Sequence, residues 1–286
     1  MMRSLYKVAS GQKKGGQSLS ESDKLSVNYH NLFDFPLTFA ELIRWQPSEN
    51  ILLNKGKDTV IYQSGYYFLE GKTGLVYKRS LRERISVKKM EIAKRTANIL
   101  GLIPGVKMVA VTGSLAMGNS SDESDIDLFV ITKKGTLWRT RAFVHLVILL
   151  SGIKKRNPKD KVQKDKLCLN MWMDESDLLW KKRDRNIYTA HEIAQILPLV
   201  NKGGAYEKFL AKNAWILEFW PNAVKMANHK LKIADRPRKT NIVEELAFKV
   251  QYLYMKNKIS REVVTPTRAI FHPQDWGKIV ISRLGY

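Results

Sequence analysis

Residues 113–131 read GSLAMGNSSDESDIDLFVI, and this stretch gives the clearest indication of the fold. An apolar, β-branched run, Val106–Thr112, precedes it, and a second run, Ile126–Thr132, overlaps its end; both are typical of buried strands. Asp125 and Asp127 are two residues apart at the start of the second run. Because side chains alternate along a strand, we expect the two carboxylates on the same side of the sheet.

Gly113 and Ser114 follow the first strand, where the chain is expected to turn into a short helix. A glycine lets phosphate approach the backbone, and a serine hydroxyl and free N–H groups can bind phosphate oxygens. The paired aspartates offer oxygen ligands, and Mg²⁺ usually takes one or two protein carboxylates together with phosphate and water. A phosphate-binding bend beside metal-binding acids is what phosphoryl or nucleotidyl transfer requires.

This pattern resembles a known signature. Gly-Ser, about ten residues, and then Asp-x-Asp on a strand is similar to the DNA polymerase β-like nucleotidyltransferase superfamily, and the SDID form is especially similar to CCA-adding and antibiotic nucleotidyltransferases. The match covers some twenty contiguous residues, and compatible βαβ surroundings extend it to about ninety. A Walker A loop and a Rossmann GxGxxG fingerprint are both missing from the sequence.

The resemblance implies a role for each matched residue. Asp125 and Asp127 would hold Mg²⁺ (or Mn²⁺) against a nucleoside triphosphate, and Gly113 and Ser114 would grip its β- and γ-phosphates. Active members use a third carboxylate on a neighbouring strand to help deprotonate the acceptor hydroxyl. The predicted third strand has Asn170 at that place, and an asparagine oxygen can bind metal but is neutral and no base.

Three interpretations of this departure stay open. Asp174, on the same face at the end of the third strand (Leu167–Met173), or its neighbour Glu175 substitutes for the acid; catalysis is weakened; or the site only binds nucleotide. A missing base can cost around 10²–10⁴ in rate.

Cationic residues near the second strand are weaker candidates. Arg139 and Arg141 begin the helix predicted after it, where they either reach the triphosphate, since arginine binds phosphate oxygens in a fork, or lie on a solvated face. Lys133 and Lys134 carry the same two interpretations. Packing roles are favoured over chemistry for three other residues: Cys168, Trp172 and His191.

The composition indicates a basic globular protein. Of 286 residues, 49 are Lys or Arg and 27 are Asp or Glu, a formal net charge of +22. Such an excess attracts polyanions, of which nucleic acid is the commonest, and a generally basic surface is the alternative. One cysteine excludes a disulfide framework within the chain and a cysteine-cluster zinc site. No signal peptide or membrane segment is recognised, so we expect a cytoplasmic protein with no membrane partner.

We expect four regions along the chain: a flexible tail over 1–22, a winged-helix-like module over 23–86, a nucleotidyltransferase core over 87–180 and a helical C-terminal domain over 181–286. The module shows helical spacing between Leu32 and Trp45 with Pro36 at a helix start, and a short helical stretch at 50–53. Strands are expected at 60–63, 66–69 and 75–77. This order resembles a winged helix-turn-helix; an α+β cap that packs on its neighbour is the alternative.

Helices are expected around and after the core strands. The basic run 78–95 leads into a helix that Gly101 and Pro104 end. Thr136 suits the N-cap of a helix that Gly152 closes, with Phe143, Leu146, Val147 and Leu150 at helical spacing. Three further helices are predicted: Tyr188–Leu199, Tyr206–Phe219 and Ile242–Lys256. The fold class is therefore α/β (α+β), a nucleotidyltransferase core with a small mixed sheet between the two flanking regions.

Two functions from different classes follow. The leading one is a Mg²⁺-dependent nucleotidyltransferase that moves NMP from an NTP to a hydroxyl and releases pyrophosphate, with nucleic acid the favoured acceptor and a protein or small molecule the alternatives. The other is a catalytically impaired, nucleotide-sensing regulator that binds nucleic acid, which Asn170 and the winged-helix pattern motivate.

Overall fold

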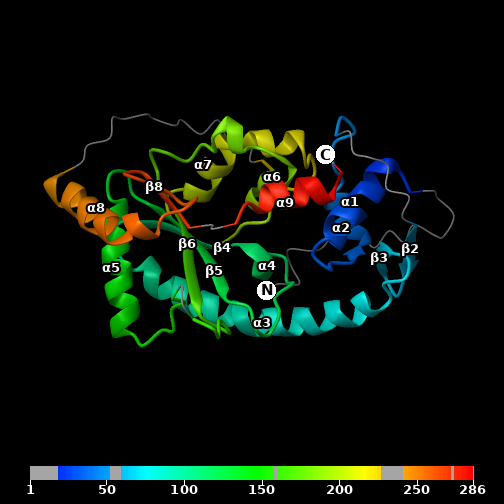
Figure 1. Ribbon diagram of the computed structural model, residues 1–286, viewed down its shortest axis with the longest axis horizontal. Helices are drawn as coiled ribbons and strands as arrows, with labels where there is room; N and C mark the ends of the chain where they lie inside the picture. The colour runs from blue at the N-terminus through cyan, green and yellow to red at the C-terminus, as the bar shows by residue number, and fades with distance from the viewer. Residues whose placement is uncertain (1–18, 52–58, 158–159, 227–240, 272–273, 286) are drawn as a thin grey trace.

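The computed structural model describes residues 19–51, 59–157, 160–226, 241–271 and 274–285. Its centre is a six-stranded mixed sheet with the strand order β7-β4-β5-β6-β9-β8 (Figure 1). These strands are β4 (Val106–Val111), β5 (Ile126–Thr132), β6 (Leu167–Asp174), β7 (Leu197–Asn201), β8 (Val263–Thr265) and β9 (Arg268–Ile270). Only the β5–β6 pair is parallel among them; the other neighbours run antiparallel. The small mixed sheet expected from the sequence is confirmed.

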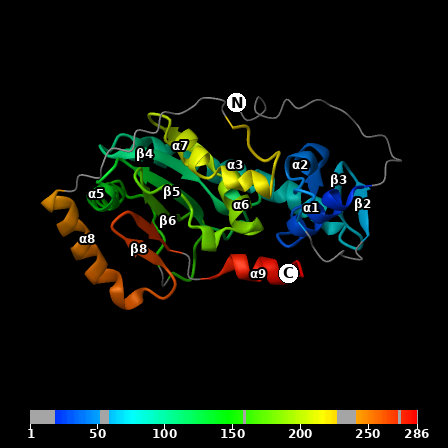
Figure 2. The same ribbon diagram turned by 90° about the horizontal axis from the view of Figure 1, so that it is seen from above.

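Helices cover both faces of this sheet, which explains why β4, β5 and β6 are apolar on both sides. One face packs against α3 (Gly74–Gly101), α5 (Leu137–Leu150) and α8 (Ile242–Met255), with Val109, Leu128 and Trp172 in the shared core. The other packs against α6 (Ile187–Ala194), α7 (Ala205–Lys212) and α9 (Trp276–Arg283), with Met108, Phe129 and Met171 in the core (Figure 2). Short 3-10 helices complete the described chain: η2 (Lys182–Asp184), η3 (Ala214–Glu218) and η4 (Lys256–Lys258).

The N-terminal region forms a small α+β module. Its elements are α1 (Glu21–Asn31), β1 (Leu37–Thr38), α2 (Phe39–Arg44), β2 (Val60–Gln63) and β3 (Tyr66–Leu69). The three strands pair in the order β1-β3-β2. Both helices start with capping boxes, Ser20 with Asp23 and Thr38 with Glu41. The helix therefore begins at Glu21, inside the predicted tail, and Pro36 precedes β1 instead of starting a helix; residues 1–18 of the tail lie outside the described residues.

The winged-helix assignment stays a prediction. The strand order is compatible with it. Of the helical stretch expected at 50–53, Asn50 and Ile51 are not helical, and residues 52 and 53 lie outside the described residues. The module does not stand apart from the rest of the chain. Its Val27, Tyr29 and Trp45 belong to the same apolar cluster as α6, α7 and α9.

One long helix connects the module to the core. α3 starts at Gly74, so the strand expected at 75–77 is wrong: the hairpin ends at Leu69, and Leu75 is buried on the first turn of the helix. α3 then runs past both parts of the molecule (Figure 1). Its Lys89 is 1% exposed and donates to the carbonyls of Asp122 and Ser124 and to the Asp165 carboxylate.

The C-terminal region corrects the expectation of a wholly helical domain. It supplies β7, β8 and β9 to the central sheet as well as α6 to α9. The helix expected over Tyr188–Leu199 ends at Ala194, because Pro198 lacks the N–H that a helix interior needs and lies in β7. The one expected over Tyr206–Phe219 divides into α7 and η3, and α8 confirms the third. In the described part of the chain, no helix has the length and apolarity needed to cross a bilayer.

Candidate active site

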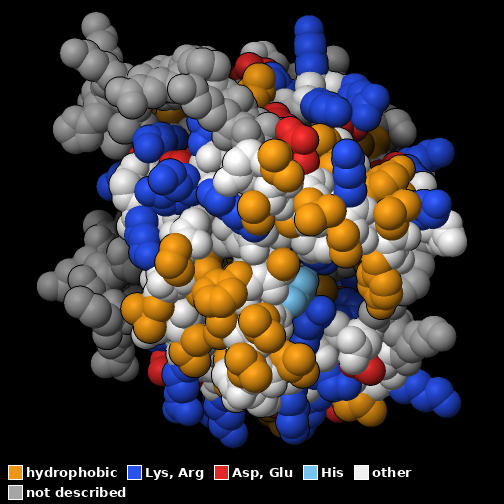
Figure 3. Space-filling model, turned by 90° about the vertical axis from the view of Figure 1, so that its left-hand side faces the viewer, with side chains coloured by type: hydrophobic (Ala, Val, Ile, Leu, Met, Phe, Trp, Pro, Cys, Tyr) orange, Lys and Arg blue, Asp and Glu red, His pale blue; other side chains and the backbone are white. Residues whose placement is uncertain are grey.

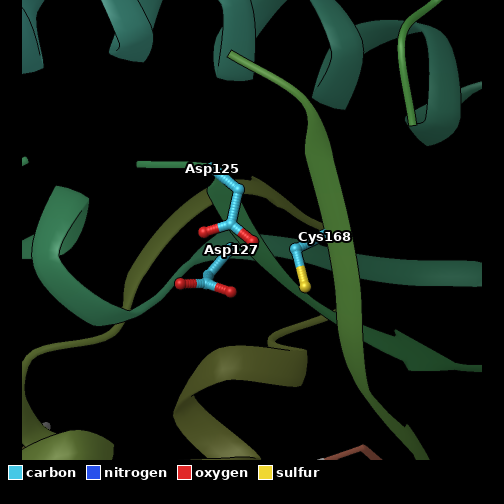
Figure 4. A group of neighbouring side chains, drawn as sticks. All are labelled: Asp125, Asp127 and Cys168. Atoms are coloured by element: carbon cyan, nitrogen blue, oxygen red, sulfur yellow. The ribbon is translucent and has the colours of Figure 1, made fainter. Parts of the chain in front are cut away.

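The two aspartates lie at the amino end of β5 and project to the same side (Figure 4). Oδ2 of Asp125 accepts a hydrogen bond of 2.7 Å from Nη1 of Arg156, and Oδ1 of Asp127 accepts one of 2.7 Å from Nδ2 of Asn170. Asp127 pairs with Cys168 across the parallel strands, so the Cys168 thiol lies beside the carboxylates. The site is thus built from β5, β6 and the loop that precedes β6.

The Gly-Ser bend lies directly against these acids, as the sequence predicts. Gly113 has φ +61° at the start of α4 (Gly113–Ala116), and a Cβ added there would lie 2.8 Å from Oδ2 of Asp127. Only glycine adopts this conformation without strain and leaves this space. The N–H of Thr112 also donates to the backbone carbonyl of Asp127. Ser114, the next residue, is exposed.

The loop between the bend and the acids is anchored from behind by α3. Ser86 Oγ accepts from the N–H of Ser120, and Arg82 donates to Oδ1 of Asn119. Asn119 in turn donates to the Phe33 carbonyl, which ties the loop to the N-terminal module. With Lys89 holding the carbonyls of Asp122 and Ser124, few groups of this loop are free to move, and the bend is pre-organised for a ligand.

Electrostatics at the site favour a bound cation. Burial, and then the charge of Asp125, raises the pKa of Asp127 to about 7. Burial also raises the pKa of the Cys168 thiol, so this sulfur is protonated near neutral pH. Two carboxylates repel each other in a partly buried site, and a divalent cation between them would stabilise both in the charged form.

The donor set fits a hard divalent cation. One ligand atom from each of Asp125, Asp127 and Cys168 lies within 4.8 Å of the others in the described chain. The buried Oδ1 of Asn170 has no hydrogen-bond partner there, which leaves an oxygen next to the acids for a ligand. Mg²⁺ and Mn²⁺ prefer such oxygen donors, whereas a protonated thiol is a poor ligand for them. The two aspartates would hold the ion, with Asn170 beside them.

Asp174 does not belong to this site. It ends β6, six residues after Cys168, which places it about 20 Å along the strand from the aspartate pair. Its buried carboxylate accepts from the N–H groups of Gly135 and Thr136 at the start of α5 and from Ser176. The expectation that Asp174 replaces the missing acid is therefore corrected: it anchors the turn that precedes α5. Glu175 lies beside it and pairs with Lys208 at 3.7 Å.

Arg139 and Arg141 lie at the same distant end, because α5 begins after β5 has ended. Arg139 is exposed on the first turn of α5, and Arg141 donates to Gln251 of α8 at 2.6 Å while stacking over Phe271. Burial lowers the pKa of Arg141 to about 10. A contact of either residue with the triphosphate is not supported, and Lys133 and Lys134 precede them at this end.

Sequence reasoning missed three residues that interact electrostatically with the aspartates. Arg156 is one of several cations in the loop 154–166, and nothing in its sequence context distinguishes it. Glu192 and Tyr188 lie one turn apart on α6, which packs on the sheet face that carries Asp127. Burial and the charge of Asp127 raise the pKa of Glu192 to about 8, and Gln195 donates to its carboxylate at 2.7 Å. Burial and the charges of Glu192 and Asp127 raise the pKa of Tyr188.

The packing roles expected elsewhere are observed. Trp172 is fully buried and donates to the Leu169 carbonyl. His191 stacks on Trp45 at 4.0 Å, and its Nε2 lies 3.1 Å from Nε2 of His30, where burial lowers the pKa of both imidazoles. This pair fastens α1 to α6. Cys168, expected in the core, instead borders the site.

Comparison with known proteins agrees with the geometry. Residues 89–184 match the family model of the nucleotidyltransferase domain. No curated protein matches the chain. Among solved structures, one described as "Crystal structure of the toxin-antitoxin with AMP-PNP" is 14% identical over 48% of this chain and 86% of that chain, with a TM-score of 0.25, too low to support an argument. Residues 89–184 of this chain form a nucleotidyltransferase domain of the polymerase β-like superfamily.

Proposed function

We propose that this protein is a Mg²⁺-dependent nucleotidyltransferase that transfers NMP from a nucleoside triphosphate to a hydroxyl acceptor. The observation that carries the proposal is the contact between the Gly113 bend and the Asp127 carboxylate, with Asp125 on the same side. It brings a backbone able to bind phosphate to within reach of two acids that bind a cation.

Each residue has a place in the transfer. The acceptor oxygen forms a bond to the α-phosphorus, the bond from that phosphorus to the bridging oxygen breaks, and pyrophosphate leaves. Gly113 and Ser114 bind the β- and γ-phosphates, and Asp125 and Asp127 would hold the divalent ion. A bound divalent ion supplies neutralisation of the phosphate charge. Arg156, held by Asp125, provides a further positive charge at this end of the sheet.

Glu192 is proposed as the third carboxylate, in place of the acid that Asn170 replaces on β6. It approaches from α6 on the face of Asp127, and it accepts the proton that the acceptor hydroxyl releases. Its position on a helix explains why the strand pattern did not reveal it. Asn170 instead donates to Asp127 and orients that carboxylate.

Nucleic acid is the proposed acceptor. The net charge of +22 attracts a polyanion, and the N-terminal module touches the nucleotide-binding loop through Phe33 and Asn119. The second candidate, a non-catalytic nucleotide sensor that binds nucleic acid, is favoured by one observation, the neutral Asn170 beside Asp127. A protein acceptor is a third outcome that the same experiment distinguishes.

The test is incubation with each labelled NTP, Mg²⁺ or Mn²⁺, and a pool of RNA, DNA and protein. We expect label in the nucleic-acid fraction, and none with Asp125→Asn/Asp127→Asn. Label in protein would refute the acceptor assignment. Salt-dependent nucleic-acid binding without incorporation of any NTP would establish the sensor instead.

The role of Glu192 has its own test. Glu192→Gln should lower kcat about 10²-fold, leave KM for the NTP nearly unchanged and remove a limb of the pH–rate profile. Glu192→Asp should recover part of the rate. Glu207→Gln, on α7, is the control. A wild-type pH profile in Glu192→Gln would refute the role, whereas loss of activity in the Asp125/Asp127 variant would still support transferase function.

A further inference from the structure

In the described part of the chain, no element covers a broad apolar surface on α5 and α8. Both pack on the sheet and on each other through residues such as Trp138, Phe248 and Gln251. The helical spacing that predicted α5 lies on its opposite, solvent side. Figure 3 shows hydrophobic side chains gathered over this end of the molecule. Soluble monomers rarely expose a contiguous apolar surface of this kind unless it binds something.

The exposed residues follow the spacing of helix–helix seams. On α5, Phe143, Leu146 and Leu150 are separated by three and then four residues, and on α8, Leu246, Val250 and Leu253 by four and then three. These six side chains are each exposed over 47 to 77% of their surface. Rows of apolar side chains at this spacing on two adjacent helices form the ridges and grooves into which a further helix packs.

The charges around this surface are mostly positive. In α5, α8 and the described residues just after α5, the exposed charged residues are Arg139, Lys154, Lys155, Glu245, Lys249 and Lys256. A second copy of this chain would bring the same positive border and be repelled. Residues 1–18 contain four Lys or Arg and no acid, and 227–240 contain five Lys or Arg and one Asp, so these parts of the chain lack complementary charge.

We propose that the α5–α8 surface binds a partner protein through an amphipathic helix whose apolar stripe is flanked by acidic residues. The apolar stripe fits the two rows of exposed apolar side chains on α5 and α8, and the acidic flanks meet the lysines at the border of the surface. This proposal does not depend on the nucleotidyltransferase activity, because α5 and α8 lie on the other face of the sheet from the one that carries Asp127.

The probe is a labelled synthetic helix with leucine at the seam positions and glutamate at the flanks. Two peptides serve as comparisons, one with lysine in place of glutamate and one with the acidic sequence scrambled. By fluorescence anisotropy, the full-length protein should bind the acidic helix at least tenfold more tightly than either, and added salt should weaken binding. Leu246→Glu/Val250→Glu should lose at least tenfold in affinity. Tyr77→Glu, at a site on α3 that is exposed over 77% of its surface, should not.

Several outcomes would overturn the proposal. Equal binding of the scrambled peptide would mean that charge alone attracts it. Light scattering that shows a dimer dissociated by Leu246→Glu/Val250→Glu would assign the surface to a second copy. Binding to vesicles containing anionic lipid, lost in the same variant and without peptide binding, would assign it to a membrane. Thermal unfolding of each variant checks that the fold is intact.

Discussion

The two ends of the β5–β6 pair hold similar acidic residues in opposite circumstances. At the amino end, Asp125 and Asp127 face each other with Arg156 and Asn170 as partners, and the pKa of Asp127 is raised to about 7. At the other end, Asp174 accepts from two backbone N–H groups and Ser176. Beside it, Asp177 forms two hydrogen bonds of 2.6 and 2.7 Å with the buried Arg268.

The acids at the two ends therefore have different roles, since one group can bind a ligand and the other stabilises the fold. Carboxylates whose hydrogen bonds are complete stabilise the fold and have little capacity left for a ligand. Carboxylates held close together with incomplete partners destabilise the folded protein and become favourable when a cation or substrate arrives. Residue type alone does not distinguish the two ends.

Asp127→Asn, at the amino end of the β5–β6 pair, should produce the largest effect. Activity should fall at least about 10³-fold, equivalent to about 4 kcal/mol of transition-state stabilisation. Stability without metal should stay equal or rise, since the variant removes a repelling charge. Single-turnover assays and thermal unfolding measure both. A large loss of stability would show that Asp127 is a structural acid like Asp174.

Asp174→Ala, at the other end of the strand pair, should lower stability and leave activity unchanged. It leaves the N–H of Gly135 without the acceptor that Asp174 provides and removes the hydrogen bond from the N–H of Ser176, which should cost about 3 kcal/mol of unfolding free energy. Activity per folded molecule at low temperature should be unchanged. Denaturant unfolding gives the first quantity and titrated activity the second. A stable, inactive variant would return Asp174 to the catalytic site.

The pH dependence of stability should report the raised pKa values of Asp127 and Glu192. The folded-state pKa values of Asp127 and Glu192, about 7 and about 8, exceed the values in the unfolded chain. At pH values between the unfolded-state and folded-state pKa, the folded protein therefore binds more protons than the unfolded chain. Metal-free stability should therefore fall as pH rises from about 4 to 8, by at most about 1.4 kcal/mol per pH unit for each group.

Thermal unfolding from pH 4 to 8 measures this slope, and Asp127→Asn should make it shallower. Mg²⁺ should raise the unfolding temperature most at the alkaline end, where both aspartates are ionised. An identical slope in wild type and Asp127→Asn would contradict the raised pKa.

Two glycine variants give the smallest expected difference. Gly113 and Gly118 both have positive φ, +61° and +69°, but a Cβ at Gly118 has nothing within 4 Å. Gly118→Ala therefore reports backbone strain alone, about 1 kcal/mol. Gly113→Ala adds the contact with Asp127 and should be about 1 kcal/mol less stable again and at least tenfold less active. Equal stability and activity would mean that the bend can move away from the acid.

Sequence patterns predicted the parts of the protein that local chemistry controls. β5 and α5 begin where expected, because an unbroken apolar run and a threonine before a helix are local signals. The contact between the bend and the acids also follows from local order, since β4 and β5 pair directly and the bend and the acids lie at the two ends of the connection between them. The errors concern long-range pairing: β7 to β9 come from distant sequence, and their short runs resemble helical or loop segments.

Local sequence order is enough to bring a Gly-Ser bend and two aspartates together at the start of a strand, because side chains alternate along a strand and one connection between two paired strands carries both. Which other charged residues join them depends on how distant segments pack. Arg156 contacts Asp125 from a loop, and Glu192 lies on a helix that packs on the face of Asp127, whereas Arg139, Arg141 and Asp174 lie at the other end of the sheet. Which end a side chain occupies depends on strand direction and crossover, which are properties of the packed core and not of neighbouring residues.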